Sequence, residues 1–264
     1  MNKKLMAFFL AIAVIAGGVW FYDWVLGDTL EASEPIQAVP LEIDTPTSEP
    51  LSDPDPTEIA EPVPDATATE AAVSVAEVET GADPPPALTR YTIVQTESQA
   101  RFTIYEELNG VPTDVIGDTD QVAGEAAINL ADLSDTRMGV ILVNARTLAT
   151  DESRRNQAIR NRILLTDQYE FISFTPTGIS GLSGSAALGQ TFTFRILGDL
   201  TIRDITQPVE FEATVSVDSP ERLTGTASTV IAKSDFNLIV PNVPFVANVG
   251  ENVTLEIDFV LAPG

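Results

Sequence analysis

Alternating apolar and polar residues predict a long antiparallel hairpin over residues 192–217. Alternate positions are apolar or glycine from Phe192 to Ile202, and again from Val209 to Val217. A period of two is what a strand with one buried face requires. The polar stretch 203–207 predicts the turn, and Pro208 begins the second strand, where its missing N–H costs the ladder little. The hairpin therefore has one apolar face that must be buried.

The same alternation predicts further strands in the C-terminal two thirds of the chain, and one segment without alternation predicts a helix. Thr150 or Asp151 can cap a helix over 150–166, where alternation is absent and Ile159 and Ile163 share a face. Many strands with one helix predict an all-β antiparallel barrel or sandwich over 89–264. The remaining strands are expected at 90–95, 101–105, 122–130, 139–146, 171–179, 222–233 and 253–261.

The first 27 residues predict a membrane segment. Lys3 and Lys4 precede an uncharged run, 5–22, that would span roughly 27 Å as a helix, close to a hydrocarbon core of roughly 30 Å. The lysines favour a cytoplasmic N-terminus, and Trp20 and Trp24 fit the aromatic belt at the outer surface. We expect a single-pass signal anchor at 1–27, with the C-terminal domain in the periplasm or at the cell surface. The alternative is a cleaved signal peptide and a secreted domain.

Residues 28–88 predict a disordered linker. They contain 15 acidic residues and 11 prolines, and no Lys or Arg. Such a composition cannot bury enough apolar area to offset the entropy of ordering. The segment would span roughly 40 Å as a coil. It is either a stalk that holds the domain off the membrane or a tether whose length is unimportant.

Composition excludes several functional classes. The chain has no Cys and no His, which removes disulfides, thiol nucleophiles, Ser–His–Asp triads and the commonest metal ligands. The net charge of −25 argues against nucleic acid as a partner. Residues 118–120 lack the remaining spacing of a calcium loop. We therefore expect neither an enzyme nor a metal site.

Several motifs in 89–264 resemble the YceI-like family of bacterial lipocalin-like polyisoprenoid-binding proteins. The most specific is Gly198-Asp-Leu-Thr-Ile-Arg-Asp-Ile-Thr-Gln-Pro-Val209. Residues 144–155 resemble the strand that leads into the family's arginine-rich helix, and 169–174 resemble the strand after it. Residues 233–236 and 91–102 resemble segments near the family's end and start.

This sequence also departs from the family pattern. The helix lacks the family's usual histidine, and Glu170 and Lys233 stand where a proline and an arginine are usual.

The resemblance implies an eight-stranded antiparallel lipocalin-like barrel with one α-helix. Such a barrel has room for its own side chains or for one ligand. The implied ligand is an isoprenoid chain, carried by a quinone or a polyprenyl lipid, with no required cofactor. A homodimer is left open.

Candidate ligand contacts are apolar residues at inward strand positions, namely Phe102, Ile104, Leu142, Phe174, Phe192, Phe194, Ile196, Leu200, Phe211, Val215 and Phe259. The alternative is that these side chains fill a closed core, which would make the domain a structural or interaction module. Candidate headgroup contacts are Arg154, Arg155, Arg160 and Arg162, whose alternative role is pairing with the 23 acidic residues of 89–264.

Overall fold

The computed structural model describes residues 30–33, 36–42, 88–242 and 246–264. Most of them are in strands: β1 (Thr89–Ile93), β2 (Gln99–Leu108), β3 (Val111–Thr119), β4 (Val122–Ala123), β5 (Glu125–Ile128), β6 (Arg137–Met138), β7 (Ile141–Asn144), β8 (Phe171–Ser180), β9 (Thr191–Ile202), β10 (Ile205–Ser219), β11 (Arg222–Ala232), β12 (Val246–Ala247) and β13 (Asn252–Pro263). The helical segments are α2 (Ser153–Ala158) and the short turns η1 (Gln95–Glu97), η2 (Leu133–Asp135), η3 (Ala145–Thr147), η4 (Ile159–Leu164) and η5 (Lys233–Phe236).

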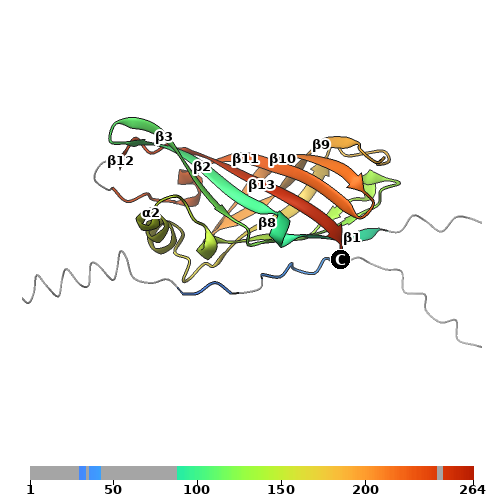
Figure 1. The fold of residues 1–264 in the computed structure, drawn as a ribbon, viewed down its shortest axis with the longest axis horizontal. Coiled ribbons are helices and arrows are strands. Elements are labelled where there is room, and N and C mark those ends of the chain that lie inside the picture. The colour runs from blue at the N-terminus through green and yellow to red at the C-terminus, as the bar shows by residue number, and fades with distance from the viewer. Residues whose placement is uncertain (1–29, 34–35, 43–87, 243–245) are drawn as a thin grey trace, which may run out of the picture. The chain divides into compact units, whose positions relative to one another are not determined.

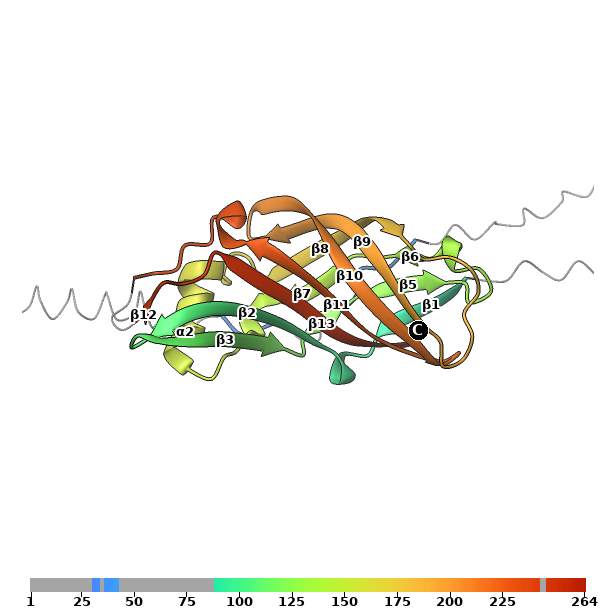
Figure 2. The same ribbon diagram turned by 90° about the horizontal axis from the view of Figure 1, so that it is seen from above.

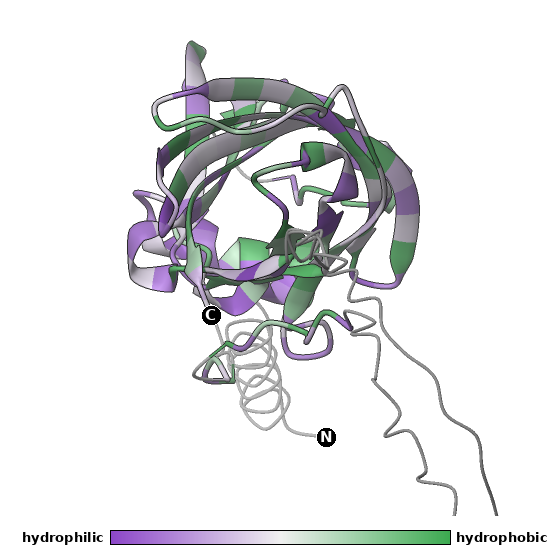
Figure 3. Ribbon diagram, turned by 90° about the vertical axis from the view of Figure 1, so that its right-hand side faces the viewer, coloured by the Kyte–Doolittle hydropathy of each residue, from purple (hydrophilic) through white to green (hydrophobic). Residues whose placement is uncertain are grey.

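These strands form one antiparallel sheet that curls around a common axis (Figures 1 and 2). Along its main path the order is β4-β7-β8-β9-β10-β11-β13-β1-β5-β6, and β2 joins β13 to β3 and β12. Only Gly124 separates β4, which pairs with β7, from β5, which pairs with β1. One broken strand therefore bonds to both ends of the curl. Viewed end-on, the strands form a ring (Figure 3), and we call this curled sheet the barrel.

The β9–β10 hairpin confirms the alternation seen in the sequence. Ile196 and Leu200 are buried, whereas Leu197 on the opposite face is 42% exposed. The turn is shorter than expected, because Ile205 already pairs with Ile202. Arg203 takes a positive φ of 60° to make this two-residue turn.

The helix begins later than the sequence predicts. Glu152, rather than Thr150 or Asp151, occupies the N-cap and accepts a hydrogen bond from the Arg154 N–H at 3.0 Å. The helix changes from α2 to a π-helical turn in η4 and ends at Leu165, which has a left-handed backbone. The apolar Ile159 face nevertheless packs into the core as expected.

The expected count of eight strands differs from the structure, in which the described residues form thirteen strand segments. One cause is β3, which the alternation of apolar and polar residues did not predict. The other is the division of expected strands into short pieces, as at Gly124. Because both differences concern how the sheet is divided, the all-β antiparallel class is unaffected.

Within these described residues, no helix is long and apolar enough to cross a membrane. The expected anchor at 1–27 lies outside the described part of the chain, as does most of the acidic linker, residues 43–87.

A segment at the start of the described chain, residues 30–33 and 36–42, lies along the outside of the barrel, and we call it the strap (Figure 1, blue). At its first end the Leu30 N–H donates to Asp167 Oδ1 at 2.9 Å. The Ser33 N–H and hydroxyl donate to the two carboxylate oxygens of Glu170 at 2.6 and 2.9 Å. Arg146 donates to the Glu31 carbonyl at 3.0 Å and pairs with Glu170 at 2.9 Å.

The other end of the strap is held by a second ion pair. The Leu41 N–H donates to Glu125 at 3.0 Å, and Arg90 donates to the Leu41 carbonyl at 2.8 Å while pairing with Glu125 at 3.1 Å. Between the two ends, Ile36 is 8% exposed. The strap therefore differs from the disordered linker expected over 28–88, because side chains of the barrel satisfy its polar backbone.

We predict that Gly198→Ala destabilises the full chain. A Cβ at Gly198 would lie 2.6 Å from the backbone oxygen of Thr175 and 2.5 Å from the Phe174 ring, so the strands would have to shift. Overpacking of this kind costs about 1 to 3 kcal/mol. The control is Gly178→Ala, where a Cβ meets nothing within 4 Å. Chemical denaturation measures both, and equal stability of the two variants would contradict this packing.

We predict that Glu170→Gln loosens the first end of the strap. Burial alone would raise the pKa of Glu170, but hydrogen bonds from Ser33 and Asn144 and the charge of Arg146 outweigh it and lower the pKa below its usual 4.5. The carboxylate therefore holds the strap above pH 4.5 and releases it as pH falls through the lowered pKa.

Hydrogen exchange at the Ser33 amide measures this. At pH 7 the Ser33 amide of the variant should exchange about tenfold faster than that of the parent, which corresponds to a loss of about 1.4 kcal/mol in the stability of this contact. In the parent the contact should also weaken as pH falls through the lowered pKa of Glu170, and in the variant it should not. Glu125→Gln is the matched control, because it should affect the Leu41 amide and leave Ser33 unchanged. A Ser33 amide that exchanges equally fast in parent and variant would show that Glu170 does not hold the strap.

Candidate functional site

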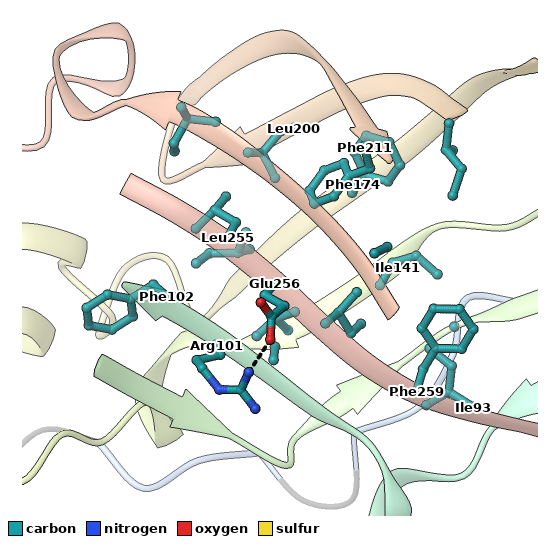
Figure 4. A pocket seen from close by; sticks show the side chains of 18 of the residues that line it. Ile93, Arg101, Phe102, Ile141, Phe174, Leu200, Phe211, Leu255, Glu256 and Phe259 are labelled. Carbon is teal, nitrogen blue, oxygen red and sulfur yellow. Dashed lines mark hydrogen bonds and ion pairs between the residues drawn. The ribbon is translucent and has the colours of Figure 1, made fainter. Parts of the chain in front are cut away.

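The interior of the barrel contains an apolar cavity of about 320 Å³. It runs the length of the sheet, from Leu130 and Leu182 near one end to Leu238 and Val249 near the other. Buried clusters of aliphatic and aromatic side chains surround it. Figure 4 shows several of these side chains directed into the space between the strands. The cavity therefore counts against a barrel filled completely by its own side chains.

Most of the apolar residues chosen from the sequence border this cavity. The lining includes Phe102, Ile104, Phe174, Phe192, Phe194, Ile196, Leu200, Phe211, Val215 and Phe259. Leu142 is the exception, since its neighbours Ile141 and Val143 line the cavity instead. Successive residues of a strand point to opposite faces, so Leu142 belongs to the outer face of β7. Contact between these residues and a ligand stays a prediction.

The aromatic residues pack into notches left by glycines. Phe174 lies against Gly198 and meets Phe211 edge to face, with ring centroids 4.9 Å apart (Figure 4). Phe102 covers Gly117 on β3 in the same way, and Ile141 covers Gly124. The glycines at 124 and 198 therefore do not leave empty volume, because Ile141 and Phe174 occupy the space where a Cβ would lie.

One end of the cavity, which we call the charged end, is bordered by Glu106, Arg155 and Lys233. Glu106 on β2 is 7% exposed and pairs with Arg155 of α2 at 3.1 Å. Arg155 also pairs with Asp151 one helical turn earlier. A positive group with two acidic partners therefore faces the cavity at this end.

Of the four arginines chosen as headgroup contacts, only Arg155 lines the cavity. Arg154 is exposed, and Arg160 and Arg162 are half-buried on the same helical segment without lining it. A helix presents one face to its neighbour, and here Ile159 and Ile163 occupy that face together with Arg155.

Sequence reasoning missed Lys233 as a lining residue. Lys233 Nζ lies 2.6 Å from Glu251, and the Ser234 N–H donates to the same carboxylate at 2.9 Å. These hydrogen bonds, more than the charge of Lys233, lower the pKa of Glu251 to about 2. The pair joins the two ends of the loop that follows η5. Leu238, Val240 and Val249 of that loop reach the cavity and also border a second hollow of about 510 Å³ on the surface.

Glu106 was also missed, although a signal for it was present. It continues the alternation of Phe102 and Ile104 on β2 and is therefore a charged residue at an inward position.

At the opposite end of the cavity, the hydroxyl of Thr136 is buried and has no hydrogen-bond partner in the described part of the chain. Arg101 and Glu256 form an ion pair between β2 and β13 beside the cavity (Figure 4).

This arrangement suits the binding of an apolar chain. Its walls offer mainly aliphatic and aromatic contacts, and the charged residues that border it are held in ion pairs. Across residues 30–33, 36–42, 88–242 and 246–264, no group of three or more acidic side chains is placed to hold a metal ion.

Comparisons with known proteins agree with this geometry. The family model for the YceI-like domain matches residues 91–261. A search of curated proteins found no match. Among solved structures, a polyisoprenoid-binding domain from Saccharophagus degradans is similar with a TM-score of 0.53 and 14% identity, over 67% of this chain and 99% of that one. BcnA from Burkholderia cenocepacia is similar with a TM-score of 0.50 and 16% identity, over 64% of this chain and 98% of that one. At these identities the two structures show the shared fold, and the match over 91–261 shows that this chain belongs to the YceI-like family.

Proposed function

We propose that this protein is a membrane-anchored, extracytoplasmic binding protein that holds an isoprenoid chain inside its barrel. The observation that carries the proposal is the apolar cavity of about 320 Å³ within a YceI-like fold. A 150 Å³ cavity is large enough for benzene. By that measure this cavity takes roughly a dozen carbons, or two to three isoprene units.

Burial of the chain supplies the affinity. Each buried CH₂ contributes about 0.8 kcal/mol, so a dozen carbons supply about 10 kcal/mol before the cost of association. A longer chain would extend beyond the cavity at one end. The charged end suits the polar part of such a lipid, because Arg155 and Lys233 can donate to a pyrophosphate or to a quinone oxygen.

The anchor in this proposal is the uncharged run at 5–22 with Lys3 and Lys4 before it. It places the barrel outside the cytoplasm, in the periplasm or at the cell surface. The role is binding rather than catalysis, since the titratable groups that border the cavity are already paired with one another or with their neighbours.

We predict that the full chain, purified from its membranes in mild detergent, retains an isoprenoid lipid. Extraction with organic solvent followed by mass spectrometry should release close to one equivalent of a quinone or polyprenyl lipid. Apo protein should bind an added isoprenoid quinone in a titration. Protein that carries no lipid and also binds no quinone or polyprenol would contradict the proposal.

We predict that Ala227→Phe prevents this binding. Ala227 is 5% exposed and lines the cavity from β11. A phenyl ring needs about as much space as benzene, so it would occupy roughly half of the cavity. Losing even two buried CH₂ groups weakens binding by more than tenfold.

Thr226→Phe is the matched control, because Thr226 is the neighbouring residue on the exposed face of the same strand. Circular dichroism should show that both variants are folded. If Ala227→Phe binds quinone as tightly as Thr226→Phe, the ligand does not occupy the cavity.

A further inference from the structure

The strap runs from the charged end of the cavity to the opposite end of the barrel. Leu30 bonds to Asp167, three residues beyond η4, and η4 lines the charged end through Ile163. Leu41 bonds to Arg90 of β1. Figure 1 shows the same course, from beside α2 toward β1. The chain therefore reaches the barrel first at the charged end.

This course sets the distance between the expected membrane segment and the barrel. Leu30 follows Tyr22, the last residue of the uncharged run, by eight positions, which extend to at most about 28 Å. The acidic stretch 43–87 adds nothing to this distance, because Leu41 and Arg90 on either side of it touch each other.

The surface at the charged end suits contact with lipid. Ile239, in the loop after η5, is 77% exposed, and Val111, at the tip of the β2–β3 hairpin, is 60% exposed. The exposed Arg154 lies on α2 at the same end. Exposed aliphatic side chains of this kind are typical of surfaces that lie in the headgroup region of a bilayer.

We infer that the strap holds the charged end of the cavity against the phospholipid bilayer. This inference rests on the proposed function, since it requires both the anchor and an isoprenoid ligand. It gives the lipid a path between the bilayer and the cavity. The chain enters the barrel through the end that faces the bilayer and does not cross water, where each exposed CH₂ costs about 0.8 kcal/mol.

Site-directed fluorescence on the full chain in phosphatidylcholine vesicles tests the orientation. The chain has no Cys, so Ile239→Cys and Leu188→Cys each give one labelling site. Leu188 is a matched control, because it is 72% exposed in the loop between β8 and β9 at the opposite end. A nitrobenzoxadiazole fluorophore on the Ile239→Cys variant should be quenched at least threefold more by doxyl-labelled phosphatidylcholine than one on the Leu188→Cys variant.

The strap's role is tested by adding Glu170→Gln to both labelled variants, with Ser33→Ala as a second way to loosen the same end. Either change should reduce the difference in quenching between the two sites. Equal quenching in the parent chain, or a difference that both strap variants leave unchanged, would overturn the inference.

Flotation of the vesicles separates this inference from the proposed function. Protein that floats with the vesicles and binds quinone, yet shows equal quenching at both sites, overturns the orientation alone. Protein that does not float overturns the proposed anchor together with the orientation.

Discussion

The inward face of the barrel must be apolar along every long strand and still leave its centre open. Glycines make this combination possible, because Phe174 and Phe102 pack against the backbone at Gly198 and Gly117, in space that a Cβ would otherwise fill. Large side chains thus exclude water from the wall without filling the cavity of about 320 Å³. A wall of smaller residues would have given a wider but less well-packed interior. The binding capacity of the domain therefore depends on how rings and glycines pair across neighbouring strands.

The sequence predicted those strands whose outer faces are polar, since only there does alternation distinguish inside from outside. It failed for β3, where the apolar Val111 and Ile116 are exposed, so that apolar and polar residues do not alternate. That strand is defined by its pairing with β2, which no local pattern reveals. The start of the helix was missed for a similar reason. Three polar residues in succession could each have capped it, and only the fold selects Glu152.

The candidate site was predictable to the extent that it follows strand alternation. Ten of the eleven apolar candidates line the cavity, and Leu142 does not, because β7 is apolar on both faces and gave no signal of its orientation. The arginines were harder to place, because a basic helix shows which residues carry charge but not which of them faces inward. The strap could not be foreseen at all. Apart from the burial of Ile36, the strap is held by hydrogen bonds to side chains that are distant in sequence, and amino-acid composition cannot predict such bonds.

Glu170 connects the departures of this chain from its family with its proposed attachment to a membrane. Where relatives usually have proline, Glu170 supplies a carboxylate that binds Ser33, Asn144 and Arg146 together. Proline has no side-chain acceptor, so the first end of the strap could not be held in this way with the usual residue. The position of the strap in turn decides which end of the barrel the preceding chain approaches. The presence of Glu170 instead of proline, just before β8, thus affects the orientation of the barrel rather than the chemistry of the ligand. This is consistent with a cavity whose lining would suit many isoprenoid chains equally well.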